Sequence, residues 1–181
     1  MKSPYQFLVL TLLAVFTQLE LAAAPKKLGY PSFLSPHARP ILVHNGHVFV
    51  ANTPSDTVDV IDAKSRKITQ RINVGIDPVS LAIRPDGREL WVANHVSDSV
   101  SIIDINPKSR TYLRVVDTVQ DFDLRTKATR FDEPVGIAFA SNEKAYVALS
   151  SENKIAIIDV RSRKVKRHLN ITAQDPRAIV V

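Results

Sequence analysis

The chain of 181 residues contains no cysteine, and this absence limits its chemistry. Disulfides, thiolate metal sites, cysteine nucleophiles and covalently attached c-type haem all need cysteine, so all are excluded for this chain. Glycine is scarce, with five residues, and no Gly-x-Ser-x-Gly elbow, phosphate loop or dinucleotide fingerprint occurs. The sequence therefore offers no candidate catalytic residue. This favours a protein that is not an enzyme, but it does not decide between the two.

Long apolar runs are also missing, except near the N-terminus. Residues 7–16 are almost entirely apolar, with Lys2 before them and three alanines at 22–24. This layout predicts a secretory signal peptide over residues 1–24 and a secreted or periplasmic protein. An uncleaved N-terminal anchor is the alternative, although a run of about ten residues is short for a span that needs roughly 20. Membrane contact is expected only through this segment.

The composition is that of a soluble domain, with 45% apolar and 23% charged residues. The formal net charge is +6, which favours acidic partners or surfaces in general. It does not by itself indicate sequence-specific binding of nucleic acid. The partner is left open between an unknown protein and an anionic surface polymer.

One pattern recurs three times, in the segments 47–75, 89–119 and 144–171. Val50, Val92 and Val147 correspond, so the residue numbers give steps of 42 and 55. The longer step predicts an insertion between about residues 119 and 130. A further unit begins at residue 175 and stops inside an apolar stretch at residue 181, which suggests truncation.

Each unit reads as four short strands separated by Asp, Asn, Pro, Gly and Ser, without helical spacing of apolar residues. In the second unit the predicted strands are 78–84, 89–93, 100–103 and 111–119. Four antiparallel strands in a unit of about 40 residues are typical of propeller blades.

The phrase WVAN…SDSVSIIDI, together with the segment VGIDPVSLAIRPDG (74–87) that precedes it in the chain, resembles the YVTN family of β-propeller repeats. The namesake tetrapeptide corresponds to residues 49–52, 91–94 and 146–149, and the resemblance covers nearly all of 37–181. It implies an all-β partial propeller with about three complete four-stranded antiparallel blades plus the start of a fourth. Residues 25–36 are left as a linker. Such propellers serve many functions, so the resemblance is informative about fold rather than activity.

The recurring residues have structural explanations. Asp62, Asp104 and Asp159 end apolar strands and are expected to accept backbone N–H groups in Asx-turns. Asn52 and Asn94 are expected to cap the loops that follow them. We expect positive φ at Gly75 and Gly87, strand starts at Pro78, Pro134 and Pro176, and packing between blades by Phe49, Trp91 and Tyr146.

The repeat also sorts the loops onto two faces. The loops between the second and third strands share one face with the links between blades, and this polar-acidic face supplies candidate ligand-binding residues: Asn52, Asp56, Asn94, His95, Asp98, Glu152 and Asn153. Ser55, Asp77, Asp132 and Glu133 are assigned to the same face. The turns between the third and fourth strands form a basic rim that could meet an anionic surface: Lys64, Arg66, Lys67, Lys108, Arg110, Arg161, Arg163 and Lys164. Solvated turns that bind nothing are the alternative for both faces.

Metal and cofactor signals are weak. Asp121 and Asp123 could join Asp132 or Glu133 around Ca²⁺, but the spacing lacks the glycine and terminal glutamate of a calcium loop. No other cofactor and no transition-metal site is predicted. His95 stands alone in a loop, where a histidine is commonly exposed.

The leading hypothesis is a non-catalytic binding or interaction scaffold outside the cytoplasm. The alternative is the N-terminal part of a propeller enzyme, a lactonase-like hydrolase or a periplasmic redox protein, whose active site needs further blades. Three complete units cannot close a ring, for which four to eight blades are typical. Self-association that completes the ring is a third possibility.

Overall fold

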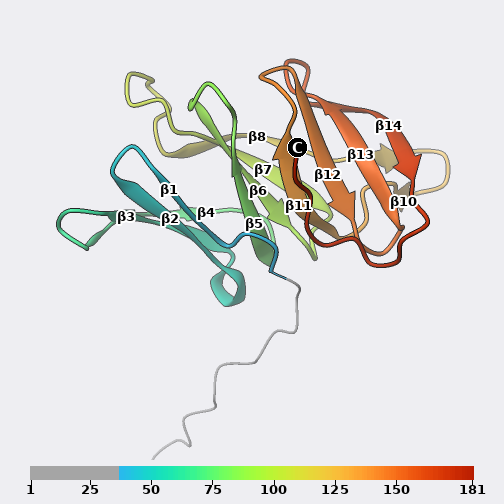
Figure 1. The fold of residues 1–181 in the computed structure, drawn as a ribbon, viewed down its shortest axis with the longest axis horizontal. Helices are drawn as coiled ribbons and strands as arrows, with labels where there is room; N and C mark the ends of the chain where they lie inside the picture. The colour runs from blue at the N-terminus through green and yellow to red at the C-terminus, as the bar shows by residue number, and fades with distance from the viewer. Residues whose placement is uncertain (1–36) are drawn as a thin grey trace, which may run out of the picture. The chain divides into compact units, whose positions relative to one another are not determined.

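The computed structural model describes residues 37–181. The predicted signal peptide (1–24) and linker (25–36) lie outside the described residues. Three four-stranded antiparallel sheets follow one another along the described chain, each with its strands in sequence order. This arrangement, drawn from blue through green to red in Figure 1, confirms the all-β partial propeller.

The first blade consists of β1 (Ile41–His44), β2 (His47–Asn52), β3 (Thr57–Asp62) and β4 (Ile68–Asn73). The second blade consists of β5 (Pro78–Ile83), β6 (Glu89–Asn94), β7 (Ser99–Asp104) and β8 (Arg114–Val119). The third blade consists of β11 (Pro134–Phe139), β12 (Lys144–Leu149), β13 (Lys154–Asp159) and β14 (Lys164–Asn170). Within 37–181, helix is limited to one 3-10 turn, η1 (Thr53–Ser55), and no helix there is long and apolar enough to cross a membrane.

The strand alternation of the middle blade explains how the blades hold together. Successive side chains of a strand point to opposite faces of the sheet. Leu90 and Val92 of β6 accordingly join a core with Phe49 of the first blade. Trp91 and Ala93 point to the opposite face of the sheet and join a second core with the third blade. The second blade is therefore covered on both faces.

The aromatic position of the repeat follows this packing. Phe49 is 2% exposed against the second blade, and Trp91 is fully buried with its ring edge-on to Phe139 of the third blade at 5.1 Å. These two residues confirm the predicted packing between blades. Tyr146, at the same position in the third blade, is only half-buried.

All three aspartates accept a backbone N–H of the turn that follows them, but only Asp104 accepts it from two residues on, as in the predicted Asx-turn, whereas Asp62 and Asp159 accept it from three residues on. The backbone N–H groups of Ser65, Asn106 and Ser162 donate to Asp62, Asp104 and Asp159 at 2.6, 2.9 and 2.8 Å. The Ser65 and Ser162 N–H bonds are the main reason why the pKa values of Asp62 and Asp159 lie below the ordinary value.

The structure corrects several expectations. The fourth strand of the second blade begins at Arg114, three residues later than predicted, because a longer turn precedes it. Positive φ is confirmed at Gly87 but is wrong for Gly75, where a Cβ atom would lie 2.4 Å from Ser97 Oγ and 2.6 Å from Asn94 Nδ2. Glycine is needed at residue 75 for this close approach.

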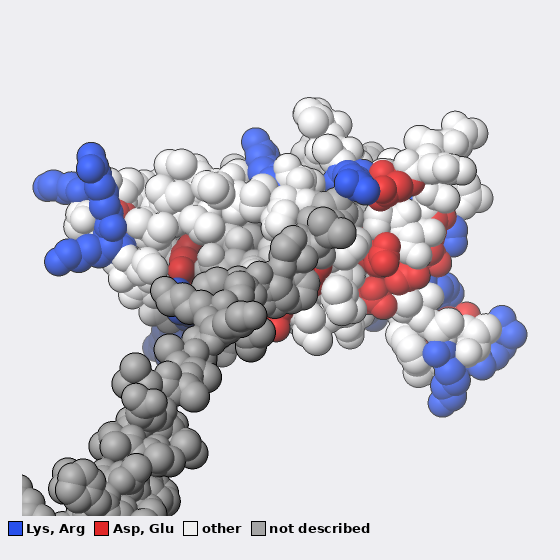
Figure 2. Space-filling model, turned by 90° about the horizontal axis from the view of Figure 1, so that it is seen from below, with Lys and Arg blue, Asp and Glu red and all other residues white. Residues whose placement is uncertain are grey.

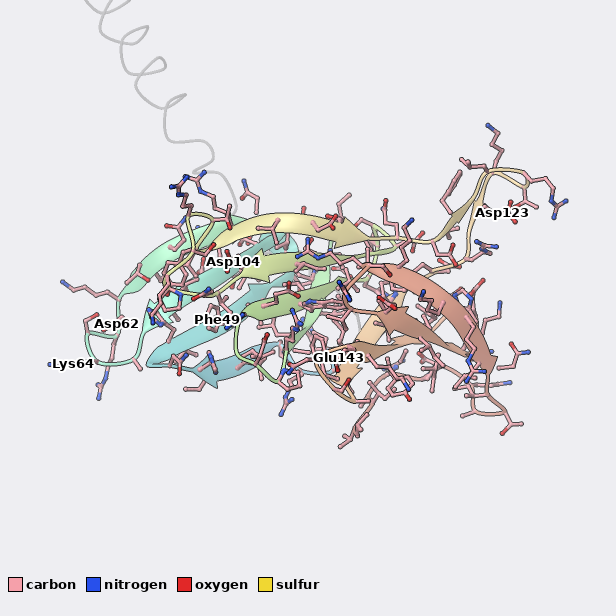
Figure 3. The ribbon with its side chains drawn as sticks, turned by 90° about the horizontal axis from the view of Figure 1, so that it is seen from above. Phe49, Asp62, Lys64, Asp104, Asp123 and Glu143 are labelled. Atoms are coloured by element: carbon pink, nitrogen blue, oxygen red, sulfur yellow. The ribbon has the colours of Figure 1, made fainter. Side chains whose placement is uncertain are left out.

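The insertion and the last segment also differ from the prediction. The insertion contains a small hairpin of β9 (Phe122–Asp123) and β10 (Ala128–Thr129), and the loop labelled Asp123 projects away from the blades in Figure 3. Pro78 and Pro134 begin β5 and β11 as predicted, whereas Pro176 begins no strand. The final residues instead run beside β11, where Arg177 O and Ile179 N lie 2.7 and 3.1 Å from the place of a Cβ on Gly136.

Candidate functional site

A repeated hydrogen bond joins each blade to the next on the polar-acidic face. The side-chain oxygen of Asp56 accepts the backbone N–H of Asp77 at 2.9 Å, and Asp98 accepts that of Glu133 at 3.1 Å. Asn153 accepts the N–H of Asp175 in the same way, at 2.8 Å. All six residues have positive φ, between 48° and 63°, which Asp and Asn tolerate better than most residues. Three predicted ligand-binding residues therefore have a structural task as clasps between blades.

The two asparagines on this face are also engaged within their own blades. Asn94 is fully buried, and its amide donates to the hydroxyls of Ser99 and Ser101 at 3.1 and 2.9 Å. Asn52 donates to the hydroxyl of Thr57 at 3.3 Å. Both asparagines bridge the loop to the following strand, as a cap would, but through side chains. Glu152 lies on this face with Lys154 Nζ at 3.4 Å.

His95 differs from the expected exposed loop histidine, since it is only 9% exposed. Its backbone N–H donates to the carbonyl of Asp77 at 2.9 Å, and its Nε2 lies 3.9 Å from a carboxylate oxygen of Glu133. The Ser150 hydroxyl donates to the same Glu133 oxygen at 3.0 Å. Thr53 occupies the place of His95 and Ser150 in the first blade, directly after β2.

Asp77 is one of the residues that were assigned to this face but not to the candidate ligand set. It is 3% exposed, and neither of its carboxylate oxygens has a hydrogen-bond partner among the described residues. Nδ1 of His95 is likewise buried without a partner. Buried polar groups normally have hydrogen-bond partners, so the unpaired atoms of Asp77 and His95 need an explanation. We call Asp77, His95 and Glu133 the link site. A signal was present in the sequence, because an acidic residue precedes proline at Asp77, Glu133 and Asp175 alike.

Charge on this face is concentrated. Figure 2 looks at the molecule from below, and acidic side chains gather there in one region while Lys and Arg project in separate groups at the edges. Burial, followed by the nearby carboxylates of Asp132 and Glu133, raises the pKa of Asp98 despite the N–H bond that it accepts. The side-chain bond from Arg177, and to a lesser degree His95, lowers the pKa of Asp175.

The basic rim divides into two kinds of residue. Arg163 is half-buried and bridges two blades, since its guanidinium donates to Glu89 at 3.0 Å and to Asp117 at 3.1 Å. The other seven side chains are exposed, and none of them forms an ion pair with another described residue: Lys64, Arg66, Lys67, Lys108, Arg110, Arg161 and Lys164. In Figure 3, Lys64 lies at the outer edge of the first blade, beyond Asp62.

The acidic residues of the insertion are held by a neighbouring arginine. Arg130 lies 2.7 Å from Asp121 and 3.9 Å from Asp123, and Asp121 also lies 3.8 Å from His168 Nε2. Within residues 37–181, no group of three or more His, Cys, Asp or Glu residues is placed to hold a metal ion. Asp121 and Asp123, two of the carboxylates proposed for Ca²⁺, are thus engaged in ion pairs.

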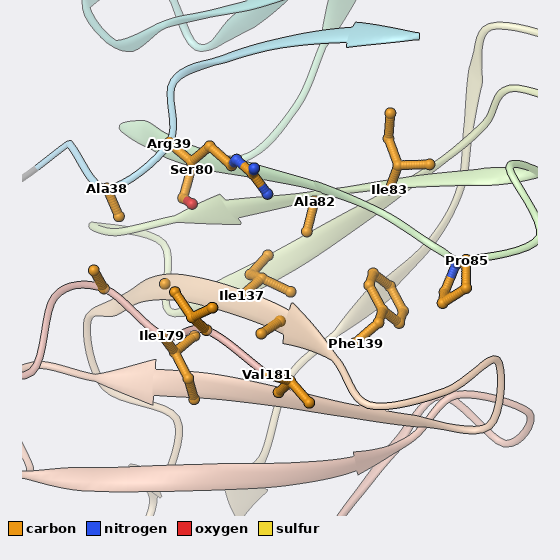
Figure 4. A pocket seen from close by; sticks show the side chains of 14 residues that line it. Ala38, Arg39, Ser80, Ala82, Ile83, Pro85, Ile137, Phe139, Ile179 and Val181 are labelled. Carbon is orange, nitrogen blue, oxygen red and sulfur yellow. The ribbon is translucent and has the colours of Figure 1, made fainter.

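The innermost strands of the second and third blades border a cavity of about 480 Å³. Figure 4 shows Ser80 and Ala82 on one side, Ile137 and Phe139 on the other, and Ile179 and Val181 of the last segment closing part of it. Apart from Arg39, its lining carries no charged side chain. Sequence reasoning did not single out this cavity, because it depends on how the strands of separate blades face one another.

Comparisons with known proteins agree with this architecture. Protein NirF of Pseudomonas aeruginosa is 34% identical over 76 residues, covering 41% of this chain and 19% of that protein. Hydrazine synthase of Kuenenia stuttgartiensis is similar with a TM-score of 0.64 and 27% identity, covering 84% of this chain and 41% of that one. The β-propeller domain of Cps50 (Swd1) from Myceliophteria thermophila matches in fold, with a TM-score of 0.60, 17% identity, and coverage of 74% and 42%.

This chain therefore spans about a fifth of the curated relative and about two fifths of these solved structures. The family model described as YNCE-like beta-propeller matches residues 1–132, which is most of the chain. That match agrees with the repeat in the sequence and with the stacked four-stranded blades. The chain belongs to the YNCE-like beta-propeller family.

Proposed function

We propose that this chain is part of an extracytoplasmic, non-catalytic propeller scaffold that binds an anionic polymer or surface through its basic rim. The observation that carries the proposal is the set of seven exposed Lys and Arg side chains, at equivalent turns, that have no acidic partner among the described residues. Charges already engaged in ion pairs are less available to a partner, and on the opposite face Asp56, Asp98 and Asn153 are engaged as clasps. The apolar N-terminal run supports the location.

The group around Glu133 supports a non-catalytic role. A nucleophilic hydroxyl is activated by a hydrogen bond to a base such as histidine. Here the Ser150 hydroxyl donates to the Glu133 carboxylate, and the imidazole of His95 approaches that same carboxylate at 3.9 Å. The Glu133 carboxylate thus lies between the Ser150 hydroxyl and the His95 imidazole, and the hydroxyl has no hydrogen bond to the imidazole that would activate it as a nucleophile.

Retention on heparin-agarose in a salt gradient tests the proposal. Lys64→Glu/Lys67→Glu reverses two charges on the rim, and Arg125→Glu/Lys127→Glu makes the same change in net charge on the exposed insertion hairpin. We expect the rim variant to elute at clearly lower salt than the wild type and the hairpin variant to change little. Exposed charges act over about 8 Å at physiological ionic strength, so retention falls as salt rises.

Equal shifts in the two variants would reduce the effect to net charge and contradict a dedicated rim. Retention of the wild type that does not depend on salt would also contradict the proposal. Far-ultraviolet circular dichroism of both variants checks that the fold is retained.

A further inference from the structure

Two equivalent acidic residues at the links between blades have different surroundings. Glu133, before β11, accepts a hydrogen bond from the Ser150 hydroxyl at 3.0 Å and keeps an imidazole nearby. Asp77, before β5, occupies the same place in the repeat, yet both of its carboxylate oxygens lack a partner among the described residues at 3% exposure. The backbone of Asp77 is fully engaged, since its N–H binds Asp56 and its carbonyl binds His95.

A buried carboxylate without a partner lowers stability, because the charge has lost its water and gained nothing in return. Asparagine would keep the shape of the Asp77 side chain and tolerate the positive φ at much lower cost. Residues that cost stability are characteristic of binding sites. The carboxylate of Asp77 is thus better explained by a ligand than by the fold.

The surrounding groups define the chemistry of that ligand. His95 contacts both acidic residues of the link site, through its backbone N–H to the Asp77 carbonyl and through its ring near the Glu133 carboxylate, and the two carboxylates have lone pairs left to accept hydrogen bonds. The described residues do not converge on a point where three of them could hold a metal ion. A group that carries several N–H donors on a larger frame can reach carboxylates that are too far apart for a single ion, and guanidinium pairs with carboxylates through two parallel bonds.

We propose that the link site binds the ammonium or guanidinium group of an organic cation, with Asp77 as its principal acceptor and Glu133 as the second. The site lies on the face opposite the basic rim and does not depend on the function proposed for that rim. The ligand is defined here by its cationic head group alone.

Isothermal titration calorimetry with agmatine, which carries both head groups, tests this assignment. We expect agmatine to bind the wild type and to bind Asp77→Asn at least tenfold more weakly, since the substitution removes the charge but keeps the size. Glu152→Gln removes a charge from the same face outside the link site and serves as the matched control, with affinity within twofold of the wild type.

Thermal unfolding without ligand provides the second readout. Asp77→Asn is expected to raise the unfolding temperature, because the cost of an unpaired buried charge disappears. A lower unfolding temperature would show that Asp77 has a structural partner and would overturn the proposal. Absence of agmatine binding at millimolar concentration, or equal binding by Asp77→Asn, would overturn it too. If Ca²⁺ from calcium chloride binds in a way that depends on Asp77 and agmatine does not bind, the site is a metal site, and the assignment to an organic cation is rejected.

Discussion

The two junctions between blades share one fold and differ in their polar chemistry. Between the second and third blades, Arg163 is paired with Glu89 and Asp117, and Glu133 is bonded to Ser150. Between the first and second blades, the position equivalent to Arg163 is Leu113, which packs against the apolar core, while the carboxylate of Asp77 has no hydrogen-bond partner among the described residues. Apolar packing and the clasp between Asp56 and Asp77 therefore join the first two blades without an ion pair like that of Arg163. The unpaired acid at the first junction is an addition that the architecture does not need.

The largest expected effect concerns the aromatic position at the second junction. Trp91→Ala is expected to cost about 3–5 kcal/mol of unfolding free energy, because it empties a fully buried site. Tyr146→Ala changes the same repeat position where it is half-buried, and about 1–2 kcal/mol is expected. Urea unfolding followed by circular dichroism measures both. Equal losses would mean that the flank of the third blade is covered as fully as that of the second.

An intermediate effect is expected for the ion pairs of the second junction. Arg163→Ala is expected to cost about 1 kcal/mol, and less in high salt, because the guanidinium holds two carboxylates of the neighbouring blade. Arg66→Ala is the control, since Arg66 has the same positive φ in the first blade and is exposed without an ion pair to another described residue. A matching loss at Arg66 would assign the effect to the turn conformation instead of the ion pairs.

The smallest expected effect concerns the clasp at the second junction. Asp98→Asn keeps the oxygen that accepts the Glu133 N–H, as Asn153 does in the third blade. Burial raises the pKa of Asp98, so its ionised form is disfavoured in the folded state and stability is lost as pH rises through that pKa. The substitution should therefore stabilise by a few tenths of a kcal/mol at pH 7. Below the unfolded value of about 3.9 the gain should vanish. Unfolding curves at both pH values check the sign, and destabilisation at pH 7 would contradict it.

Much of the fold could be predicted because each blade repeats local signals. Asp62, Asp104 and Asp159 end strands in register, and alternating apolar residues define both faces of the middle sheet. The turn before Arg114 could not be placed, since a polar stretch fits a longer strand or a longer turn equally well. Gly75 was misassigned because its reason is a tertiary contact with Ser97 and Asn94, which no local pattern records.

The candidate site was less predictable for a related reason. Sorting loops by face correctly brought Asp56, Asp98 and Asn153 together with the links, but polarity alone does not distinguish a clasp from a ligand-binding group. The same holds for Arg163 among the basic residues, which only its neighbours reveal as an ion-paired bridge. Asp77 required knowledge of burial and of missing partners, both of which arise only when the blades pack.

The insertion hairpin has a practical consequence for protein engineering. β9 and β10 pair with each other, and their turn is closed by its own Asp123, which accepts the backbone N–H groups of Arg125 and Thr126. Leu124 at the tip is 79% exposed. A reporter domain or fluorophore grafted at this tip would be tethered to the scaffold through a self-contained stem, leaving the radial stacking of the sheets unaltered.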